Sequence, residues 1–426
     1  MKTVISIFLI IYSCHSQPGW NIQFTGTNVY LYSVQFMNSN TGWLSGQSGT
    51  ILKTTNGGSY WLPQQSGTAN FLYTIFFIDI NTGWACGQSG TIRKTTNSGL
   101  NWASQTSTFT QYIYSVLFSD AFTGYFCGSG GTIYKTTDGG TLWTQKSSPV
   151  TGTLSCMHFP ASALMQTGYI SGGTATEGII LKTSNSGENW TQLSGTGGNW
   201  LFGIFFADNM TGWAGGINGA LIKTINGGNN WITQVSGTTN RIVAMFFANQ
   251  NTGWTVGYAG TILYTSNGGN NWSQQVSNTI QNLWGVHFID AYTGWAVGWN
   301  GELVHTTNGG LTAITPISSE IPKEYSLQQN YPNPFNPVTK IRFSLPSPSE
   351  GGVYNVTLDI YDLLGRKIAS LIPPLWGGQE GLSPGTYEVE WNAANYSSGV
   401  YYYKLVVGEN TNNGVLYETK KMILIK

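Results

Sequence analysis

The chain has 426 residues, of which only 8% are Asp, Glu, Lys or Arg and 14% are Phe, Trp or Tyr. Its formal net charge is zero and its Lys and Arg residues do not cluster, so the sequence lacks the positive field that attracts nucleic acid or anionic lipid. The 56 Gly and 17 Trp residues suit short strands joined by tight turns. We therefore expect an all-β protein that binds no nucleic acid.

The first residues have the features of an export signal. Lys2 supplies the positive charge, residues 4–12 the apolar stretch and residues 13–16 small side chains for cleavage, which predicts a signal peptide at residues 1–16. This apolar stretch is too short to span a bilayer and no longer one follows it, so we expect no transmembrane segment. A second interpretation stays open, in which Cys14 is the acylated residue of a lipoprotein site.

A tripeptide of Thr, Gly and then Trp or Tyr recurs seven times in residues 17–315. Each of the seven units holds four short apolar stretches separated by turn residues, which is typical of a β-propeller blade. We predict a seven-bladed β-propeller over residues 17–315, because a ring of stacked sheets buries apolar faces that one sheet cannot bury alone. The glycines of the tripeptide are Gly42, Gly83, Gly124, Gly168, Gly212, Gly253 and Gly294.

Each unit also contains a Ser/Thr-x-Asn/Asp-x-Gly pattern, followed in six of the units by Trp three residues later. The Asn or Asp side chain accepts hydrogen bonds from backbone N–H groups and so forms a hairpin turn, which explains the residues without a ligand. This Asp-box pattern resembles bacterial-neuraminidase-type repeats and the propellers of photosystem II assembly factors. The resemblance implies the fold rather than a function, because propellers serve as enzymes, receptors and scaffolds. We expect a structural role for Asn56, Asn97, Asp138, Asn185, Asn226, Asn267 and Asn308.

The seventh unit has Ala313 where the other six have the Trp. Trp20 lies near the N-terminus in a stretch that otherwise looks like the end of a repeat. We predict that this stretch forms the outer strand of the last blade and closes the ring by main-chain hydrogen bonds.

The inner strands offer the best candidate binding surface. Aromatic rings around a concave opening suit the faces of sugars or the side chains of a peptide. The residues two places after the opening positions of these strands, from Tyr32 to Trp284, are expected to pack between the blades instead. We expect a glycan or protein ligand to be held at the channel mouth by Tyr30, Phe71, Tyr112, Trp200, Arg241, Tyr258 and Trp299.

Catalytic groups are scarce in the propeller. Glu177 and Glu302 fall in loops that could face one mouth, which makes them candidates for the acid/base pair of a glycoside hydrolase. The His residues lack the spacing of metal ligands, and we expect no metal and no cofactor. The preferred function is a non-catalytic binding or adhesion module, with an extracellular glycoside hydrolase and a structural envelope or assembly scaffold as alternatives.

Five lysines occupy one equivalent position of the third strands. They form either an anion-binding ring or, as we prefer, stems that pack across the blade while the ammonium reaches solvent or a turn carbonyl. These residues are Lys53, Lys94, Lys135, Lys182 and Lys223.

Three cysteines remain once the predicted signal peptide is removed. Cys86 and Cys127 hold equivalent places in neighbouring units, so a disulfide between them is conceivable. We prefer the interpretation that they and Cys156 fill the β-core, because an unpaired Cys behaves as a small hydrophobic residue.

The composition changes after a Pro-bearing linker predicted at residues 316–325. Residues 326–426 alternate apolar and polar side chains over several strands, which predicts a small Ig-like β-sandwich. The stretches NYPNPFNP, IYDLLGR and the terminal KMILIK resemble the C-terminal sorting domain that the type IX secretion system recognises. The resemblance implies that the secretion machinery is a partner and that the protein is secreted or attached to the outer cell surface.

Overall fold

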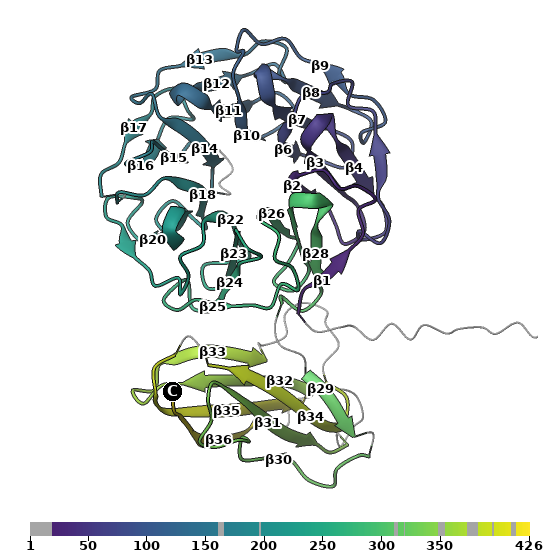
Figure 1. Ribbon diagram of the computed structural model, residues 1–426, viewed down its shortest axis with the longest axis vertical. Helices are drawn as coiled ribbons and strands as arrows, with labels where there is room; N and C mark the ends of the chain where they lie inside the picture. The colour runs from purple at the N-terminus through teal and green to yellow at the C-terminus, as the bar shows by residue number, and fades with distance from the viewer. Residues whose placement is uncertain are drawn as a thin grey trace, which may run out of the picture.

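The computed structural model describes residues 19–160, 166–195, 197–310, 314–318, 320–347, 354–372, 382–393, 396–409 and 415–426. The signal peptide predicted at residues 1–16 lies outside these residues. Up to residue 310, the described strands form seven four-stranded sheets arranged in a ring, which we call blades 1 to 7 (Figure 1). The predicted all-β propeller fold is confirmed. No helix in the described part of the chain is long and apolar enough to cross a membrane.

The first strand of each blade lies next to the central channel. Each inner strand contacts the inner strands of both neighbouring blades, and the last of them contacts the first, so the ring is closed. Most residues of these strands are apolar because they face other blades on both sides. The inner strands are β2 (Leu31–Phe36), β6 (Leu72–Phe77), β10 (Ile113–Phe118), β14 (Thr153–His158), β18 (Leu201–Phe206), β22 (Ile242–Phe247) and β26 (Leu283–Phe288).

The second strand of each blade begins with the Gly-Trp or Gly-Tyr pair of the repeated tripeptide. Its aromatic ring stacks on the ring of a Phe in the next blade, as Trp43 does on Phe77 with centroids 3.8 Å apart. Trp295 of blade 7 stacks on Phe36 of blade 1 at 3.5 Å, so the pattern continues across the closure. The second strands are β3 (Gly42–Gly46), β7 (Gly83–Gly87), β11 (Gly124–Gly128), β15 (Gly168–Gly173), β19 (Gly212–Gly216), β23 (Gly253–Gly257) and β27 (Gly294–Gly298).

The third strand follows the second after a short turn, which in five blades includes a single turn of 3₁₀ helix: η1 (Gln47–Gly49), η2 (Gln88–Gly90), η3 (Ser129–Gly131), η4 (Ile217–Gly219) and η5 (Trp299–Gly301). The last Gly of this turn has a positive φ and approaches the chain that enters the next blade; a Cβ at Gly49 would lie 1.9 Å from the Thr68 carbonyl oxygen. The third strands are β4 (Ile51–Thr54), β8 (Ile92–Thr95), β12 (Ile133–Thr136), β16 (Gly178–Thr183), β20 (Leu221–Thr224), β24 (Ile262–Thr265) and β28 (Leu303–Thr306).

The outer strands are short and follow the Asp-box turns. The turn Trp covers the blade: Trp61 meets Phe36 edge-on with centroids 5.8 Å apart, and the other five turn Trp residues repeat this contact at 5.8–6.1 Å. The outer strands of blades 1 to 6 are β5 (Leu62–Gln64), β9 (Ala103–Ser104), β13 (Thr144–Lys146), β17 (Thr191–Gln192), β21 (Ile232–Thr233) and β25 (Ser273–Gln274).

The outer strand of blade 7 comes from the N-terminus, as predicted. Strand β1 (Asn21–Gln23) pairs antiparallel with β28, with Asn21 opposite His305. Trp20 precedes this strand as Trp61 precedes β5, and it meets Phe288 edge-on at 5.6 Å. Its ring is fully buried and its Nε1 donates a hydrogen bond to Gln275 Oε1 over 2.8 Å. Trp20 therefore takes the place of the Trp that the seventh repeat lacks.

The C-terminal strands form two four-stranded sheets that share one core, in the order β29-β34-β31-β30 and β33-β32-β35-β36. Strand β29 begins at residue 314, so part of the linker expected at residues 316–325 is instead paired in the first sheet. The strands are β29 (Ile314–Ser318), β30 (Ser326–Leu327), β31 (Val338–Leu345), β32 (Tyr354–Tyr361), β33 (Lys367–Ile372), β34 (Gly385–Asn392), β35 (Gly399–Glu409) and β36 (Val415–Leu424).

Candidate functional site

Every inner strand contains a β-bulge at its second or third residue. In blade 1, Leu31 pairs with Gly46 and Ser33 pairs with Ser45, so Tyr32 is an extra residue without a partner in the second strand. A bulge redirects the side chain of the extra residue. We call the seven extra residues the bulge ring: Tyr32, Tyr73, Tyr114, Ser155, Phe202, Val243 and Trp284.

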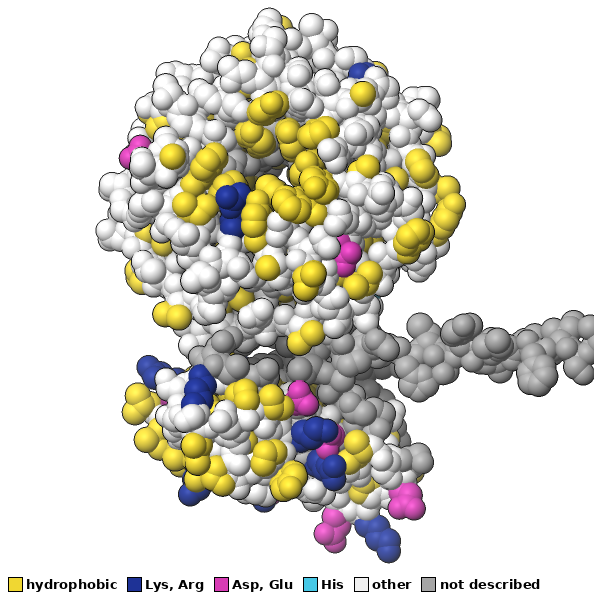
Figure 2. Space-filling view, viewed as in Figure 1, with side chains coloured by type: hydrophobic (Ala, Val, Ile, Leu, Met, Phe, Trp, Pro, Cys, Tyr) yellow, Lys and Arg dark blue, Asp and Glu magenta, His cyan; other side chains and the backbone are white. Residues whose placement is uncertain are grey.

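All seven side chains of the bulge ring line a cavity of about 520 Å³ in the channel. Figure 2 shows the opening in the middle of the propeller, surrounded by hydrophobic side chains with one Lys or Arg side chain beside them. The prediction that these residues pack between the blades is wrong. The prediction assumed that side chains alternate strictly along the strand. The bulge adds one residue to the strand and turns these side chains into the channel.

Aromatic residues of the bulge ring contact one another around the cavity. The ring centroids of Tyr32 and Tyr73 are 5.0 Å apart, and those of Tyr73 and Tyr114 are 5.3 Å apart. Trp284 meets Tyr32 edge-on at 5.8 Å. The wall of the cavity in blades 7, 1, 2 and 3 is therefore a continuous aromatic surface.

The residues predicted at the channel mouth either line this cavity or contact residues of its wall. Tyr30, Trp200 and Trp299 line the cavity, and Tyr30 stacks on Trp299 with centroids 4.8 Å apart. Phe71 and Tyr112 do not line the cavity but contact Tyr73 at 6.3 and 6.1 Å.

Arg241 and Tyr258 complete the mouth between blades 5 and 7. The Arg241 guanidinium lies 4.6 Å from the ring centroids of both Phe202 and Tyr258, and one of its nitrogens donates a hydrogen bond to the Tyr258 hydroxyl over 2.9 Å. Tyr258 also contacts Trp284 and Trp299. The structure therefore brings the predicted residues together, and the bulge ring adds seven further residues to the cavity wall.

Blade 4 interrupts the aromatic wall. Its contribution is Thr153, Ser155 and Cys156, and Ser155 Oγ accepts a hydrogen bond from Trp200 Nε1 over 3.2 Å. Strands β15 and β16 are also longer than in other blades and pair as far as Gly173 and Gly178. Blade 4 thus gives the channel hydroxyl groups where most other blades supply aromatic rings, and we call this its polar side.

In three blades, a backbone N–H group of the inner strand donates a hydrogen bond to a side chain of the preceding blade. Gln35 Oε1 accepts a hydrogen bond from the Phe77 N–H over 2.6 Å. His158 and His287 hold the corresponding positions in blades 4 and 7, and their Nδ1 atoms accept from the Phe206 and Phe36 N–H groups over 3.2 and 3.4 Å. Burial lowers the pKa of both histidines to about 4, so the rings are neutral and can act as acceptors at neutral pH.

The tyrosines of the cavity remain protonated at neutral pH. Burial, with a smaller contribution from Tyr30, raises the pKa of Tyr32 to about 12. Burial and the neighbouring tyrosines raise the pKa of Tyr73 further above its usual range. Within the described residues, neither hydroxyl has a protein hydrogen-bond partner, so both can donate to and accept from a ligand.

The Asp-box residues form turns. Asn56 Oδ1 accepts from the Thr54 hydroxyl over 2.9 Å and from the Tyr60 N–H over 3.0 Å. The same pair of bonds recurs in blades 2 to 6, and Asn308 accepts from the Thr306 hydroxyl and the Gly310 N–H in blade 7.

The five lysines of the third strands also make structural contacts. Each Nζ lies 5.1–5.6 Å from the centroid of the aromatic ring in the second strand of its own blade. Lys94 Nζ, for example, donates over 2.9 Å to the Gly139 carbonyl in the next Asp-box turn. These contacts agree with the packing interpretation and not with an open anion-binding ring.

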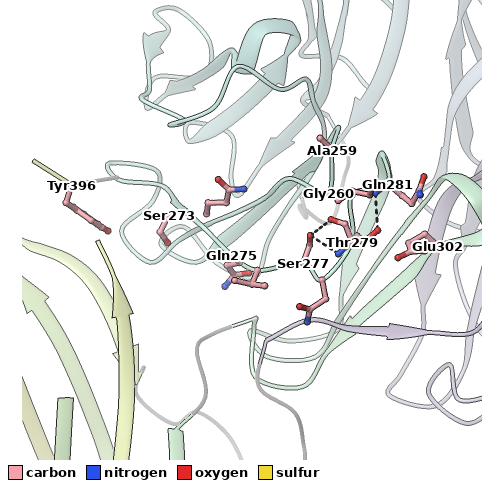
Figure 3. Close-up of a pocket in the computed structure, with 13 residues that line it drawn as sticks. Ala259, Gly260, Ser273, Gln275, Ser277, Thr279, Gln281, Glu302 and Tyr396 are labelled. Atoms are coloured by element: carbon pink, nitrogen blue, oxygen red, sulfur yellow. Dashed lines mark hydrogen bonds between the residues drawn. The ribbon is translucent and has the colours of Figure 1, made fainter. Parts of the chain in front are cut away.

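The two glutamates considered for hydrolysis do not share a site. Glu302 lines a groove of about 690 Å³ between blades 6 and 7, with residues 273–281 and, from the C-terminal domain, Tyr396 (Figure 3). Glu177 is exposed in the β15–β16 hairpin and lines neither this groove nor the channel cavity. The geometry therefore gives this pair no support as an acid/base couple.

The three cysteines in the described part of the chain are unpaired. Cys86 and Cys127 are buried in the cores between blades, and Cys156 is half-buried beside the channel. Burial raises the pKa of all three thiols. In the described residues, no three His, Cys, Asp or Glu side chains are placed to hold a metal ion.

The fold and the cavity define a β-propeller of Asp-box repeats with an aromatic channel. Residues 13–108, 98–197 and 196–281 match the model of the family described as photosynthesis system II assembly factor YCF48. These matches span more than half of the 426 residues, and the chain belongs to this family. Residues 329–424 match the secretion system C-terminal sorting domain, which implies secretion or attachment to the cell surface. A comparison with curated proteins finds no similar sequence.

Solved structures show the same fold. YCF48 bound to D1 peptide has a TM-score of 0.59 and 19% identity, covering 69% of this chain and 98% of that chain. YCF48 from Cyanidioschyzon merolae has a TM-score of 0.57 and 19% identity, covering 68% and 98%. The RRP9 WD40 repeats have a TM-score of 0.58 but only 8% identity, covering 69% and 99%. At these identities the likeness concerns the fold alone.

Proposed function

We propose that this protein is an exported, non-catalytic binding module that holds an extracellular glycan or protein segment in the channel cavity. The observation that carries the proposal is the bulge ring, which turns an aromatic side chain into the channel in five of the seven blades. Rings packed only for stability would be expected to lie between the sheets, where they exclude water completely. A concave, mostly apolar cavity with a few polar groups is typical of a ligand site.

The related structures support the use of this fold for holding a ligand. The solved YCF48 propeller is bound to a peptide, so a propeller of similar fold serves as a binding protein. The sorting domain supports an extracellular place of action, because its match implies secretion. The proposal covers both a released protein and one attached to the outer cell surface.

The test is a binding screen of the purified full-length protein against immobilised glycans and peptides. We expect Trp284→Ala to lose binding, because Trp284 forms part of the cavity wall. Tyr60→Ala is the matched control, since Tyr60 is 63% exposed in an outer turn of blade 1. Binding that Trp284→Ala leaves intact would contradict the proposal. Failure to bind any probe, together with a co-purifying protein, would favour the structural scaffold.

A further inference from the structure

We propose that the channel cavity takes the end of an uncharged carbohydrate chain. This inference rests on the proposed function of the cavity as a binding site and names the chemical class of its ligand. Four properties of the cavity support it: the charge of its wall, the free polar groups of the wall, the hydrogen bonds at its strand edges and its shape.

The wall carries no formal charge. Among the described residues that line the cavity, none is Asp, Glu, Lys or Arg. Arg241, at the mouth, lies against the Phe202 and Tyr258 rings and donates to the Tyr258 hydroxyl. An ionised ligand at the bulge ring would lose its hydration without meeting an opposite charge among the lining residues, which is costly. The cavity therefore selects an uncharged ligand.

The wall combines aromatic faces with unused polar groups. The Tyr32 and Tyr73 hydroxyls have no protein partner in the described residues. Ser155 adds a hydroxyl on the polar side of the channel. A ligand made only of apolar groups would leave these donors and acceptors unpaired, which costs binding energy. A sugar ring offers an apolar face to the aromatic rings and hydroxyls to the polar groups.

The strand edges argue against a peptide bound as an added β-strand. Such a peptide needs free backbone N–H and C=O groups at a sheet edge. Below the bulges, side chains already occupy the edge: Ser33 Oγ accepts from the Ile75 N–H over 3.3 Å and Ser115 Oγ from the Met157 N–H over 3.1 Å. Gln35, His158 and His287 occupy the next free N–H group in their neighbouring blades. Beside blades 1, 2, 4 and 5, a peptide backbone would therefore find these N–H groups already occupied.

The shape of the site indicates that the end of a chain binds. The cavity of about 520 Å³ lies within the range of about 300–1,000 Å³ that holds small ligands. It is surrounded on all sides by the inner strands, so a long polymer cannot lie across it as in an open cleft. One or a few terminal sugar units can enter along the channel axis while the rest of the chain stays outside the mouth.

The experiment compares three sets of immobilised probes: uncharged oligosaccharides, matched oligosaccharides with a terminal sialic or uronic acid, and peptides. The full-length protein is tested beside Tyr73→Ala and Tyr73→Phe. We expect the uncharged oligosaccharides to bind. Tyr73→Ala should weaken this binding at least about tenfold through loss of ring stacking, and Tyr73→Phe should weaken it roughly threefold to tenfold through loss of one hydrogen bond. Tyr60→Ala and Tyr60→Phe should leave binding unchanged, because Tyr60 is far out on blade 1.

The outcomes separate this inference from the proposed function. If peptides or acidic sugars bind, and Tyr73→Ala abolishes this binding, the cavity is a binding site but its ligand is not an uncharged carbohydrate. If uncharged sugars bind equally well to wild type and Tyr73→Phe, a hydrogen bond from the Tyr73 hydroxyl to the sugar is refuted. If Tyr73→Ala keeps its melting temperature and binds every probe as the wild type does, both the ligand class and the binding site fail.

Discussion

Two histidines make the stability of the propeller sensitive to acid. His158 and His287 accept backbone hydrogen bonds through Nδ1, as Gln35 does through its side-chain oxygen in blade 1. A glutamine cannot take up a proton in this pH range, so His158→Gln together with His287→Gln should keep the hydrogen bonds and remove the titration. Gln35 thus shows that a glutamine can accept this hydrogen bond at the equivalent position.

The magnitude follows from the pKa values. Burial lowers the pKa of each histidine from 6.5 in the unfolded chain to about 4 in the fold. The contribution of each neutral histidine to the free energy of unfolding is therefore fully present above pH 6.5. It is lost as pH falls toward 4, because the unfolded state binds the proton more readily. At pH 5 this loss is at most about 2 kcal/mol for each histidine. Together, the two histidines should lower the free energy of unfolding of the wild type at pH 5 by at most about 4 kcal/mol relative to pH 7.5.

The assay is denaturant unfolding of the wild type and the double variant at pH 7.5 and pH 5.0. Carboxylates titrate in both proteins, so their contribution cancels in the difference. We expect the unfolding free energy of the variant to fall by less than that of the wild type, with a gap of at most about 4 kcal/mol at pH 5.0. If both proteins lose the same stability between the two pH values, the assignment of the acid sensitivity to these two imidazoles is refuted.

The closure of the ring provides two further tests. Trp20→Ala should lower the unfolding free energy by about 3–5 kcal/mol, because it leaves a cavity beside Phe288 and removes the bond to Gln275; a loss in denaturant unfolding no larger than that of a surface substitution would contradict the closure. Gly301→Ala should lower the melting temperature by several degrees, because its Cβ would lie 1.9 Å from the Thr27 carbonyl oxygen. Gly26→Ala is the matched control: Gly26 also has a positive φ, but nothing lies within 4 Å of the added Cβ, so an equal fall in thermal unfolding would refute the steric argument.

Much of the fold can be predicted from local patterns. The Asp-box turn depends on residues at most four positions apart, such as the hydrogen bonds among Thr54, Asn56 and Tyr60, so its sequence pattern predicts its geometry. The place of Trp20 can also be predicted, because every other repeat has a Trp at that position and the seventh does not. The linker is harder to place, since strand β29 is paired with a strand about 70 residues further along the chain.

The candidate site also contains residues that local sequence patterns predict and residues that they do not. The residues at the mouth, such as Tyr30 and Trp299, can be predicted because they precede a strand or follow one, where the position in the repeat directs the side chain outward. A pattern of simple alternation places the bulge ring between the blades, because this pattern does not include the extra residue of a bulge. Local sequence patterns are enough to place the repeats, the turns and the strand that closes the ring. That Tyr32, Tyr73 and their counterparts face the channel follows only from the folded chain, because the direction of a side chain at a bulge depends on the register between two strands.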